Sequence, residues 1–353
     1  MRAIQSGFGC RPVLRRAAAI FATGLLASAL VGFPAQAQTV NVYSARQEAL
    51  IKPVLDQFTA SSGIQVNLVT GDGDALLARL INEGRNSPAD VLLTVDAGRL
   101  YRAREAGVLR PVESAFLERA IPSHLRDSEG YWFGLSVRAR VIAYSRERVK
   151  PAELSTYEAL AGPQWRGRIC IRSSGNIYNQ SLVAGMLATE GQAATARWLE
   201  GLVANLARSP QGGDRDQIKA VAAGQCDLAV VNSYYYGAML QSDDAAERTA
   251  AEAVAIFFPN QAGRGTHINI SGAGVTAAAD NVEAAIALIE YLARPEAQRW
   301  YAERNNEYPV RLDVEPGALL SSWGDFKADS VDVVELGRLN APAVMAMDRA
   351  NWK

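Results

Sequence analysis

The sequence predicts an α/β fold with two lobes that enclose a cleft. Strand and helix patterns alternate over residues 40–106, and a second alternating set begins at Gly167. Extended stretches connect the two sets. Such alternation indicates βαβ units and a mostly parallel sheet, and ligands of these sheets bind beyond the carboxyl ends of the strands, often between domains. A chain of 353 residues is long enough for about two domains.

The first set is defined by short apolar strands between helices with one apolar face. For example, Leu50, Val54, Leu55 and Phe58 recur at helical spacing, and Gly63 follows as a stop signal. The expected elements are strands at 40–43, 64–69 and 90–95, and helices at 49–58, 74–82 and 99–106.

The second set follows two extended stretches within residues 132–144, around Arg138 and Arg140. The expected elements are strands at 168–172 and 227–231, helices at 180–189, 195–206 and 217–223, extended segments at 256–258 and 267–275, and an apolar helix at 281–293. Pro295 stops that last helix.

The first 37 residues have the layout of a secretory signal peptide. Basic residues between Arg11 and Arg16 precede an apolar run from Ala17 to about Phe33, and Ala35-Gln36-Ala37 matches an A-x-A cleavage site. The alternative is a membrane anchor, but the run of about 17 residues barely spans a bilayer. Arg15-Arg16 also leaves twin-arginine export open as an alternative to the Sec route. We therefore expect a periplasmic location.

Charge and composition are those of an ordinary globular protein. Charged residues make up 21% and hydrophobic residues 49% of the chain, which excludes a disordered or low-complexity chain. The formal net charge is −1, and four of the 36 basic residues but none of the 37 acidic ones lie in residues 1–37, so the remainder carries −5. The lack of basic excess argues against a nucleic-acid partner.

Two cysteines, Cys170 and Cys226, remain after the signal segment. The predicted compartment permits a disulfide, but the sequence does not give the distance between them. Because each cysteine lies in or near an apolar strand, we expect two buried thiols, with a disulfide as the alternative. Their wide spacing does not match a zinc site.

Signatures of catalysis are weak. Only two histidines are present, His124 and His267, and neither has metal-ligand spacing. The sequence has no G-x-S-x-G, Walker or G-x-G-x-x-G motif, and Gly71-Asp72-Gly73 is too short for a phosphate loop. Both histidines are expected to be structural, and we expect the chain not to be an enzyme.

Tyrosines follow two strands of the second set. Tyr234-Tyr235-Tyr236 comes directly after the strand at 227–231, and Tyr178 comes shortly after the strand at 168–172. Consecutive side chains of an extended strand point to opposite faces, so three successive tyrosines cannot all enter the core. We expect phenols to converge at this edge of the sheet.

Converging phenols suit a hard trivalent cation. Three phenolates neutralise Fe(III), and a bound cation stabilises the deprotonated form of a phenol whose free pKa is about 10. Octahedral Fe(III) leaves room for an anion or water. The turn at Ser173, Ser174 and Asn176 opens a helix whose free N–H groups are candidates to hold that anion. The alternative is that the tyrosines stack in a core or line a sugar or peptide cleft.

At these residues the chain resembles the periplasmic ferric-iron-binding proteins that feed ABC importers. The resemblance covers nearly the whole mature chain, and Tyr178, Tyr234 and Tyr235 fall where that family has its three iron-ligating tyrosines, whereas Tyr236 does not. Specific blocks lie at residues 42–46, 86–91, 132–136, 138–142, 210–217 and 269–274. The resemblance implies a type II periplasmic binding protein that closes by a hinge.

One part of the family pattern is absent. Many relatives place a His, a Tyr or both after the first strand, where this chain has Gln47 and Glu48. A three-tyrosine site completed by carbonate or a similar anion is therefore expected. Glu48 is a further oxygen donor, with an exposed first-turn acid as the alternative.

Four charged residues are candidates for the anion or for the surroundings of the iron. Arg46, Arg138 and Arg140 are candidates to hold the anion or to supply nearby charge, with a salt bridge as the alternative for each. Asp96 follows the strand at 90–95 and either faces the cleft or caps a helix.

The predicted function is a monomeric Fe(III) receptor that delivers iron to an inner-membrane ABC permease. An organic-anion, polyamine or sugar receptor of the same fold is the alternative, and a secreted hydrolase or lyase is a remote one. The expected lobes are residues 38–135 with about 262–315, and residues 136–261, with a helical segment at 316–353 packing on them.

Overall fold

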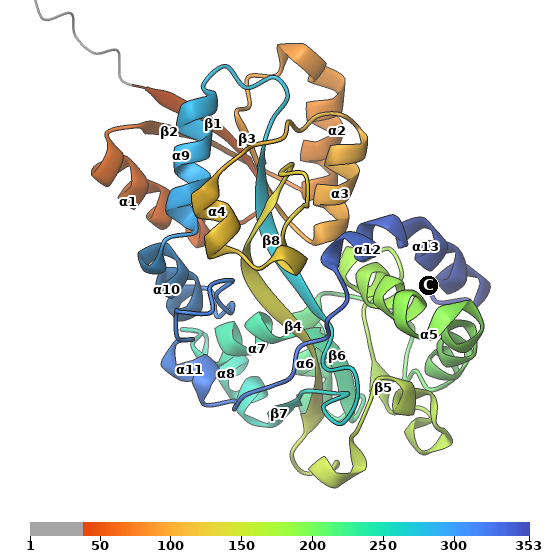
Figure 1. Ribbon diagram of the computed structural model, residues 1–353. Coiled ribbons are helices and arrows are strands. Elements are labelled where there is room, and N and C mark those ends of the chain that lie inside the picture. Colours follow the sequence, from red (N-terminus) through yellow and green to blue (C-terminus); the bar gives the residue numbers. More distant parts are fainter. Residues whose placement is uncertain (1–37) are drawn as a thin grey trace, which may run out of the picture. The chain divides into compact units, whose positions relative to one another are not determined.

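The computed structural model describes residues 38–353, and the predicted signal segment, residues 1–37, lies outside the described residues. An eight-stranded sheet runs through this part of the chain in the order β2-β1-β3-β8-β4-β6-β5, and β7 pairs with β4 off this path. Helices lie against it on both halves (Figure 1). The predicted α/β class is confirmed.

The first half of the sheet is built from β1 (Thr39–Ser44), β2 (Gln65–Thr70) and β3 (Val91–Val95). Strand β1 pairs in parallel with both others. Three helices follow these strands: α1 (Lys52–Ser62), α2 (Gly73–Glu83) and α3 (Ala97–Glu105). A fourth helix, α4 (Ala115–Ala120), comes after α3. Helix α1 starts three residues later than predicted because Glu48–Leu50 forms a separate 3-10 turn.

The second half contains β5 (Ile169–Cys170), β6 (Leu228–Asn232) and β7 (Val254–Phe257). Its helices are α5 (Ile177–Ala204), α6 (Asp214–Ala222), α7 (Ser233–Leu240) and α8 (Ala245–Glu252). The two helices predicted at 180–189 and 195–206 are one helix, α5, kinked at Gly191, whose φ of 76° lies in the left-handed region that glycine tolerates.

Two long strands join the halves. β4 (Phe133–Ser145) is one strand of 13 residues rather than two stretches, and it pairs first with β8 (Ile268–Val275) and then with β6 and β7. Both run antiparallel to their neighbours across the halves, so the sheet is mixed and the expectation of a mostly parallel sheet is wrong. Strands β4 and β8 are antiparallel to every strand with which they pair.

The C-terminal part returns over both halves. After α9 (Val282–Leu292) and α10 (Pro295–Arg304), the chain forms α11 (Ala318–Ser321), α12 (Val333–Arg338) and α13 (Asn340–Arg349). Helix α12 packs on α3 and α5, and α13 packs on α5.

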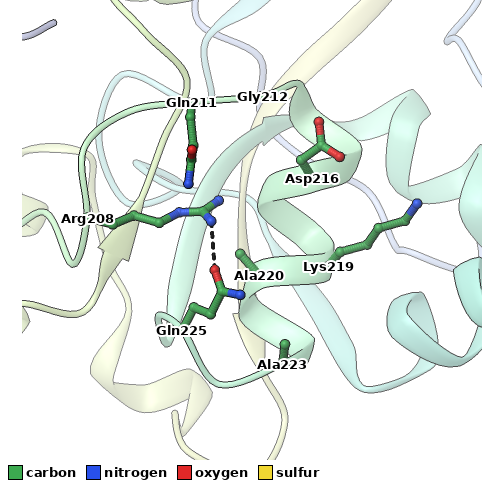
Figure 2. A pocket seen from close by; sticks show the side chains of 8 residues that line it. All are labelled: Arg208, Gln211, Gly212, Asp216, Lys219, Ala220, Ala223 and Gln225. Atoms are coloured by element: carbon green, nitrogen blue, oxygen red, sulfur yellow. Dashed lines mark hydrogen bonds between the residues drawn. The ribbon is translucent and has the colours of Figure 1, made fainter.

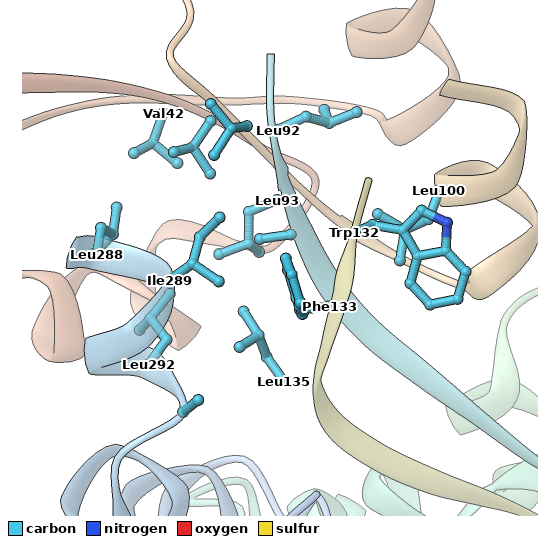
Figure 3. Close-up of a cluster of buried hydrophobic side chains, with 14 of the residues drawn as sticks. Val42, Leu92, Leu93, Leu100, Trp132, Phe133, Leu135, Leu288, Ile289 and Leu292 are labelled. Carbon is cyan, nitrogen blue, oxygen red and sulfur yellow. The ribbon is translucent and has the colours of Figure 1, made fainter. Parts of the chain in front are cut away.

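The buried hydrophobic side chains form separate clusters in the two halves. One cluster joins strands β1 and β3 to α9 and the first part of β4, as the side chains of Val42, Leu93, Phe133 and Ile289 show in Figure 3. Two others lie in the second half, one around α5 and α13 and one around α6, β6 and α7. The change from one core to the others falls between Val137 and Ala139 of β4.

Cys170 and Cys226 form a disulfide with a Cα–Cα distance of 5.8 Å. Both residues are buried, as expected, but the prediction of two free thiols is wrong. Parallel pairing of β5 with β6 brings the two segments together, since Ile169 lies opposite Leu228 and Cys170 opposite Ala229. Within residues 38–353, no helix is both long and apolar enough to cross a membrane.

Candidate metal centre

A cleft of about 580 Å³ contains all three predicted tyrosines in its lining. Tyr178, Tyr234 and Tyr235 come from the second half of the sheet. The opposite lining comes from the first half and the segment after α10: Ala45, Arg46, Gln47, Leu50, Val95, Arg304, Asn305 and Glu307. The cleft is thus lined by side chains from both halves of the sheet.

Parallel pairing of β5 and β6 explains how residues 56 positions apart meet. The chain turns after each strand and starts a helix, α5 or α7, and Tyr178 and Tyr234 are each the second residue of their helix. The carboxyl ends of parallel neighbours lie at one edge of a sheet, so the two helix starts are adjacent. The side chain of Asn176 caps α5 by accepting from the backbone N–H of Tyr178.

Helix α7 (Ser233–Leu240) points the side chains of the three consecutive tyrosines in different directions. Successive residues of an α-helix are about 100° apart, so Tyr234 and Tyr235 share one side, whereas Tyr236 points roughly opposite to Tyr234. Tyr236 is buried, donates to the carbonyl of Val254 and lies beside Trp323. The family resemblance implied the separation of Tyr236 from the other two, but the helix that causes it was not predicted.

The phenols are close enough to share one cation. The hydroxyl oxygens of Tyr178 and Tyr234 are 3.3 Å apart, and the rings of Tyr234 and Tyr235 have centroids 4.2 Å apart. Burial raises the pKa of Tyr234 well above its ordinary value, and the Tyr178 and Tyr235 phenols raise it further. Burial also raises the pKa of Tyr235. The Tyr234 and Tyr235 phenols are therefore neutral at neutral pH when no cation is bound, and a cation must displace their protons.

Arg46 lies at the cleft and is engaged by a carboxylate. Its Nη2 is 2.5 Å from Oε2 of Glu307, and its Nη1 donates to the hydroxyl of Ser271. Burial acts to lower the pKa of Arg46, but the Glu307 carboxylate together with the Tyr301 and Tyr234 phenols keeps the pKa above its ordinary value. For Arg46 the salt-bridge alternative describes the contact in this structure.

Arg138 and Arg140 are buried in β4 and do not line the cleft. The Arg138 guanidinium donates to the Ile270 carbonyl and lies 5.9 Å and 6.0 Å from the ring centroids of Tyr178 and Tyr234. It supplies positive charge behind the phenols. Arg140 forms a buried ion pair with Asp214, 3.0 Å from Nη1 to Oδ2, and does not reach the tyrosines through any contact.

The remaining predicted residues of the first half divide into exposed and buried positions. Gln47 and Glu48 are exposed; Gln47 lines the cleft and Glu48, in the 3-10 turn, does not. Asp96 is fully buried and caps α3 by accepting from the N–H of Gly98, so the capping alternative describes its role. It also accepts from Ser181 of α5 and Asn269 of β8, and burial raises its pKa.

Ser173, Ser174 and Asn176 form the turn before α5, but none of them lines the cleft. The residue before them does. Arg172 borders the cleft with its guanidinium carbon 5.6 Å from the Tyr178 ring centroid. Arg172 and Glu307 were not among the predicted site residues, because one basic and one acidic residue in irregular segments carry no periodic signal.

Other groups in the described part of the chain do not compete with this site. A second hollow of about 390 Å³ beside α6 is bordered by Arg208, Asp216 and Lys219, and Arg208 is hydrogen-bonded there to Gln225 (Figure 2). It includes no predicted site residue. Residues 38–353 contain no cluster of three or more His, Cys, Asp or Glu side chains able to hold a metal ion.

Comparison with known proteins places this geometry in context. The profile of the bacterial extracellular solute-binding protein family matches residues 86–326. Iron uptake protein A1 of a Synechocystis strain is 49% identical over 320 residues, which is 91% of this chain and 89% of that protein. The Fe(3+)-binding periplasmic protein of Serratia marcescens is 30% identical, covering 88% and 92%.

A solved structure of a Trichodesmium protein in complex with iron and citrate superposes with a TM-score of 0.87. It is 50% identical in sequence, and the match covers 89% of this chain and all of that one.

Proposed function

Because the chain belongs to the bacterial extracellular solute-binding protein family, we propose that it captures Fe(III) for import. Its fold is the two-lobed type II periplasmic binding fold of the ferric-binding proteins, as its likeness to the iron- and citrate-bound structure indicates. Tyr178, Tyr234 and Tyr235 are the proposed iron ligands, and a carbonate or carboxylate anion completes the coordination.

The observation that carries this function is the meeting of phenols from two helix starts. Tyr178 and Tyr234 are 3.3 Å apart at their oxygens, with Tyr235 beside them, on the wall of a cleft. Three phenolates match the charge of Fe(III), and hard oxygen donors suit a hard cation. The Arg138 guanidinium lies 6.0 Å from the Tyr234 ring centroid and acts to lower the pKa of that phenol, which favours its deprotonated form.

The division of the hydrophobic core supports the proposal that two lobes close around the cleft. Residues 38–135 with about 262–315 form one proposed lobe and residues 136–261 the other, with 316–353 packing on both. Separate hydrophobic clusters support this division. β4 and the segment before β8 cross between the lobes and are the proposed hinge.

The proposed setting is the periplasm, reached by cleavage of the signal segment at residues 1–37. The proposed partner is an ABC permease of the inner membrane, which receives the iron from a monomeric, non-catalytic receptor. The family match and the names of the relatives support this setting.

Colour tests the function directly. Iron–tyrosinate charge transfer gives a visible absorption band, so the mature chain should turn coloured on addition of ferric citrate and keep about one iron after desalting. A colourless mixture that retains no iron contradicts the proposal.

A further inference from the structure

Arg172 is a cation of the tyrosine cleft whose side chain has no hydrogen-bond or ion-pair partner within residues 38–353, although it lies over the Tyr178 ring. Its Nε is buried without a hydrogen bond, and no described residue forms an ion pair with its guanidinium. Its backbone is fixed, since its carbonyl accepts from the side chains of Asn179 and Trp352. The side chain thus starts from an anchored point and carries a buried Nε–H without an acceptor, which is costly unless a ligand satisfies it.

Most other cations of the cleft have a carboxylate partner. Arg46 pairs with Glu307, and Arg215 and Lys219 both pair with Glu247. Arg304 has no carboxylate partner within residues 38–353, but it is exposed to solvent. Arg172 is partly buried and lies against the ring of a proposed iron ligand, and unlike Arg138 it lines the cleft, so its charge can reach a ligand held there.

Charge balance indicates what this group would meet. Three phenolates cancel the charge of Fe(III), so an anion that fills the remaining coordination positions brings charge that the iron does not offset. The planar guanidinium fork matches the geometry of a carboxylate or carbonate and can donate two parallel hydrogen bonds.

We propose that Arg172 binds the anion that accompanies iron, a planar oxyanion that is either carbonate or a carboxylate of an organic acid. The proposal rests on the proposed iron-binding function. The sequence predicted that the turn at Ser173, Ser174 and Asn176 holds the anion, but this turn does not border the cleft. We assign the contact instead to Arg172, the residue before the turn.

The test measures how strongly the anion and iron support each other's binding. Fe(III) affinity is determined by chelator competition in carbonate-free buffer, then with bicarbonate, then with citrate, for the wild type, Arg172→Gln and Arg172→Lys. The ratio of affinities with and without anion gives the coupling between the two ligands. Arg208→Gln is the matched control, because it removes a guanidinium of the same half that lies outside the tyrosine cleft.

The wild type and Arg208→Gln should show the same ratio, and Arg172→Gln should lower that ratio at least tenfold. Arg172→Lys should keep part of it, because the charge remains without the fork. A ratio lost only with bicarbonate identifies carbonate, and one lost only with citrate identifies an organic acid. Both results support the proposal.

An unchanged ratio in Arg172→Gln overturns the inference, and so does an equal loss of affinity with and without anion, which would mean that Arg172 acts only on the phenolates. Both results leave iron binding by the wild type intact. Failure of the wild type to bind iron contradicts the proposed function itself.

Discussion

The hydroxyl oxygens of Tyr178 and Tyr234 lie 3.3 Å apart although 56 residues separate them. The same separation relates Cys170 to Cys226, which form the disulfide. Each cysteine precedes its tyrosine by eight residues. The disulfide and the pair of phenols therefore connect the same two chain segments, those that contain β5 and β6. The core of the second half therefore fixes the relative position of two proposed iron ligands.

Replacing a proposed ligand should weaken iron binding far more than replacing its neighbour. Tyr234→Phe removes a phenolate and should lower Fe(III) affinity by more than the roughly 10–100-fold expected for loss of an outer-shell partner. Tyr236→Phe, on the opposite side of α7, is the matched control and should keep the visible band. Equal iron titrations for the two variants contradict the ligand assignment.

Iron binding should release protons from the phenols. Burial raises the pKa of Tyr234 and Tyr235, so both are protonated in the empty protein at neutral pH. Each proton displaced by iron makes the affinity rise about tenfold per pH unit, and acidification therefore favours release. Proton release is measured by titration in weak buffer, with the protons of the iron chelator subtracted. Tyr234→Phe should release one proton fewer, and an affinity independent of pH contradicts the site.

The disulfide should contribute strongly to stability. Linking Cys170 to Cys226 closes a loop across a sequence separation of 56 residues, which corresponds to about 4 kcal/mol in the chain-entropy description of the unfolded state. Cys170→Ala with Cys226→Ala should lower the free energy of unfolding by an amount of this order in urea. A reducing agent should destabilise the wild type and leave the double variant unchanged. Coincident unfolding curves for wild type and variant contradict this expectation.

The alternation of elements was predictable because apolar spacing is a local signal. Val54, Leu55 and Phe58 mark the buried face of α1 whatever lies elsewhere in the chain. The tyrosine site was also within reach, because Tyr178 and Tyr234 follow strands that a parallel sheet brings together. In contrast, the segment that became α7 carries three aromatic residues in succession, and that run has neither helical nor strand periodicity.

Contacts between distant segments were beyond the reach of sequence patterns. The partner of Arg46 is Glu307, 261 residues away, and it follows a helix in an irregular segment. The pairing of Cys170 with Cys226 depends on the register of β5 and β6, which a strand pattern does not supply. Arg172 is recognisable only once the other cations are seen to have partners.

Buried His267 should make the fold sensitive to acid. Burial lowers the pKa of His267 from 6.5 to about 3, and the nearby Arg264, Arg140 and Arg138 charges act in the same direction. The unfolded chain therefore binds a proton that the folded chain does not between about pH 6.5 and pH 3, so stability falls as the pH drops through this window. His267→Gln should reduce the slope by about 1.4 kcal/mol per pH unit between roughly pH 6 and pH 4. Parallel urea-derived stability curves contradict it.

Asp214 should affect both stability and iron binding, because it connects a buried cation to the start of the tyrosine helix. It pairs with Arg140 at 3.0 Å and accepts from the backbone N–H of Asn232, the residue that precedes α7. Asp214→Asn leaves the Arg140 charge without its carboxylate, and breaking a buried pair costs about 3–5 kcal/mol. Because the contact at Asn232 weakens as well, Tyr234 and Tyr235 are held less firmly, and iron affinity should fall in the fraction that remains folded.

Asp243→Asn, an exposed position in the same half, should change stability by less than about 0.5 kcal/mol and leave iron binding intact. If Asp214→Asn unfolds at the wild-type urea concentration, the ion pair does not hold α7 in place.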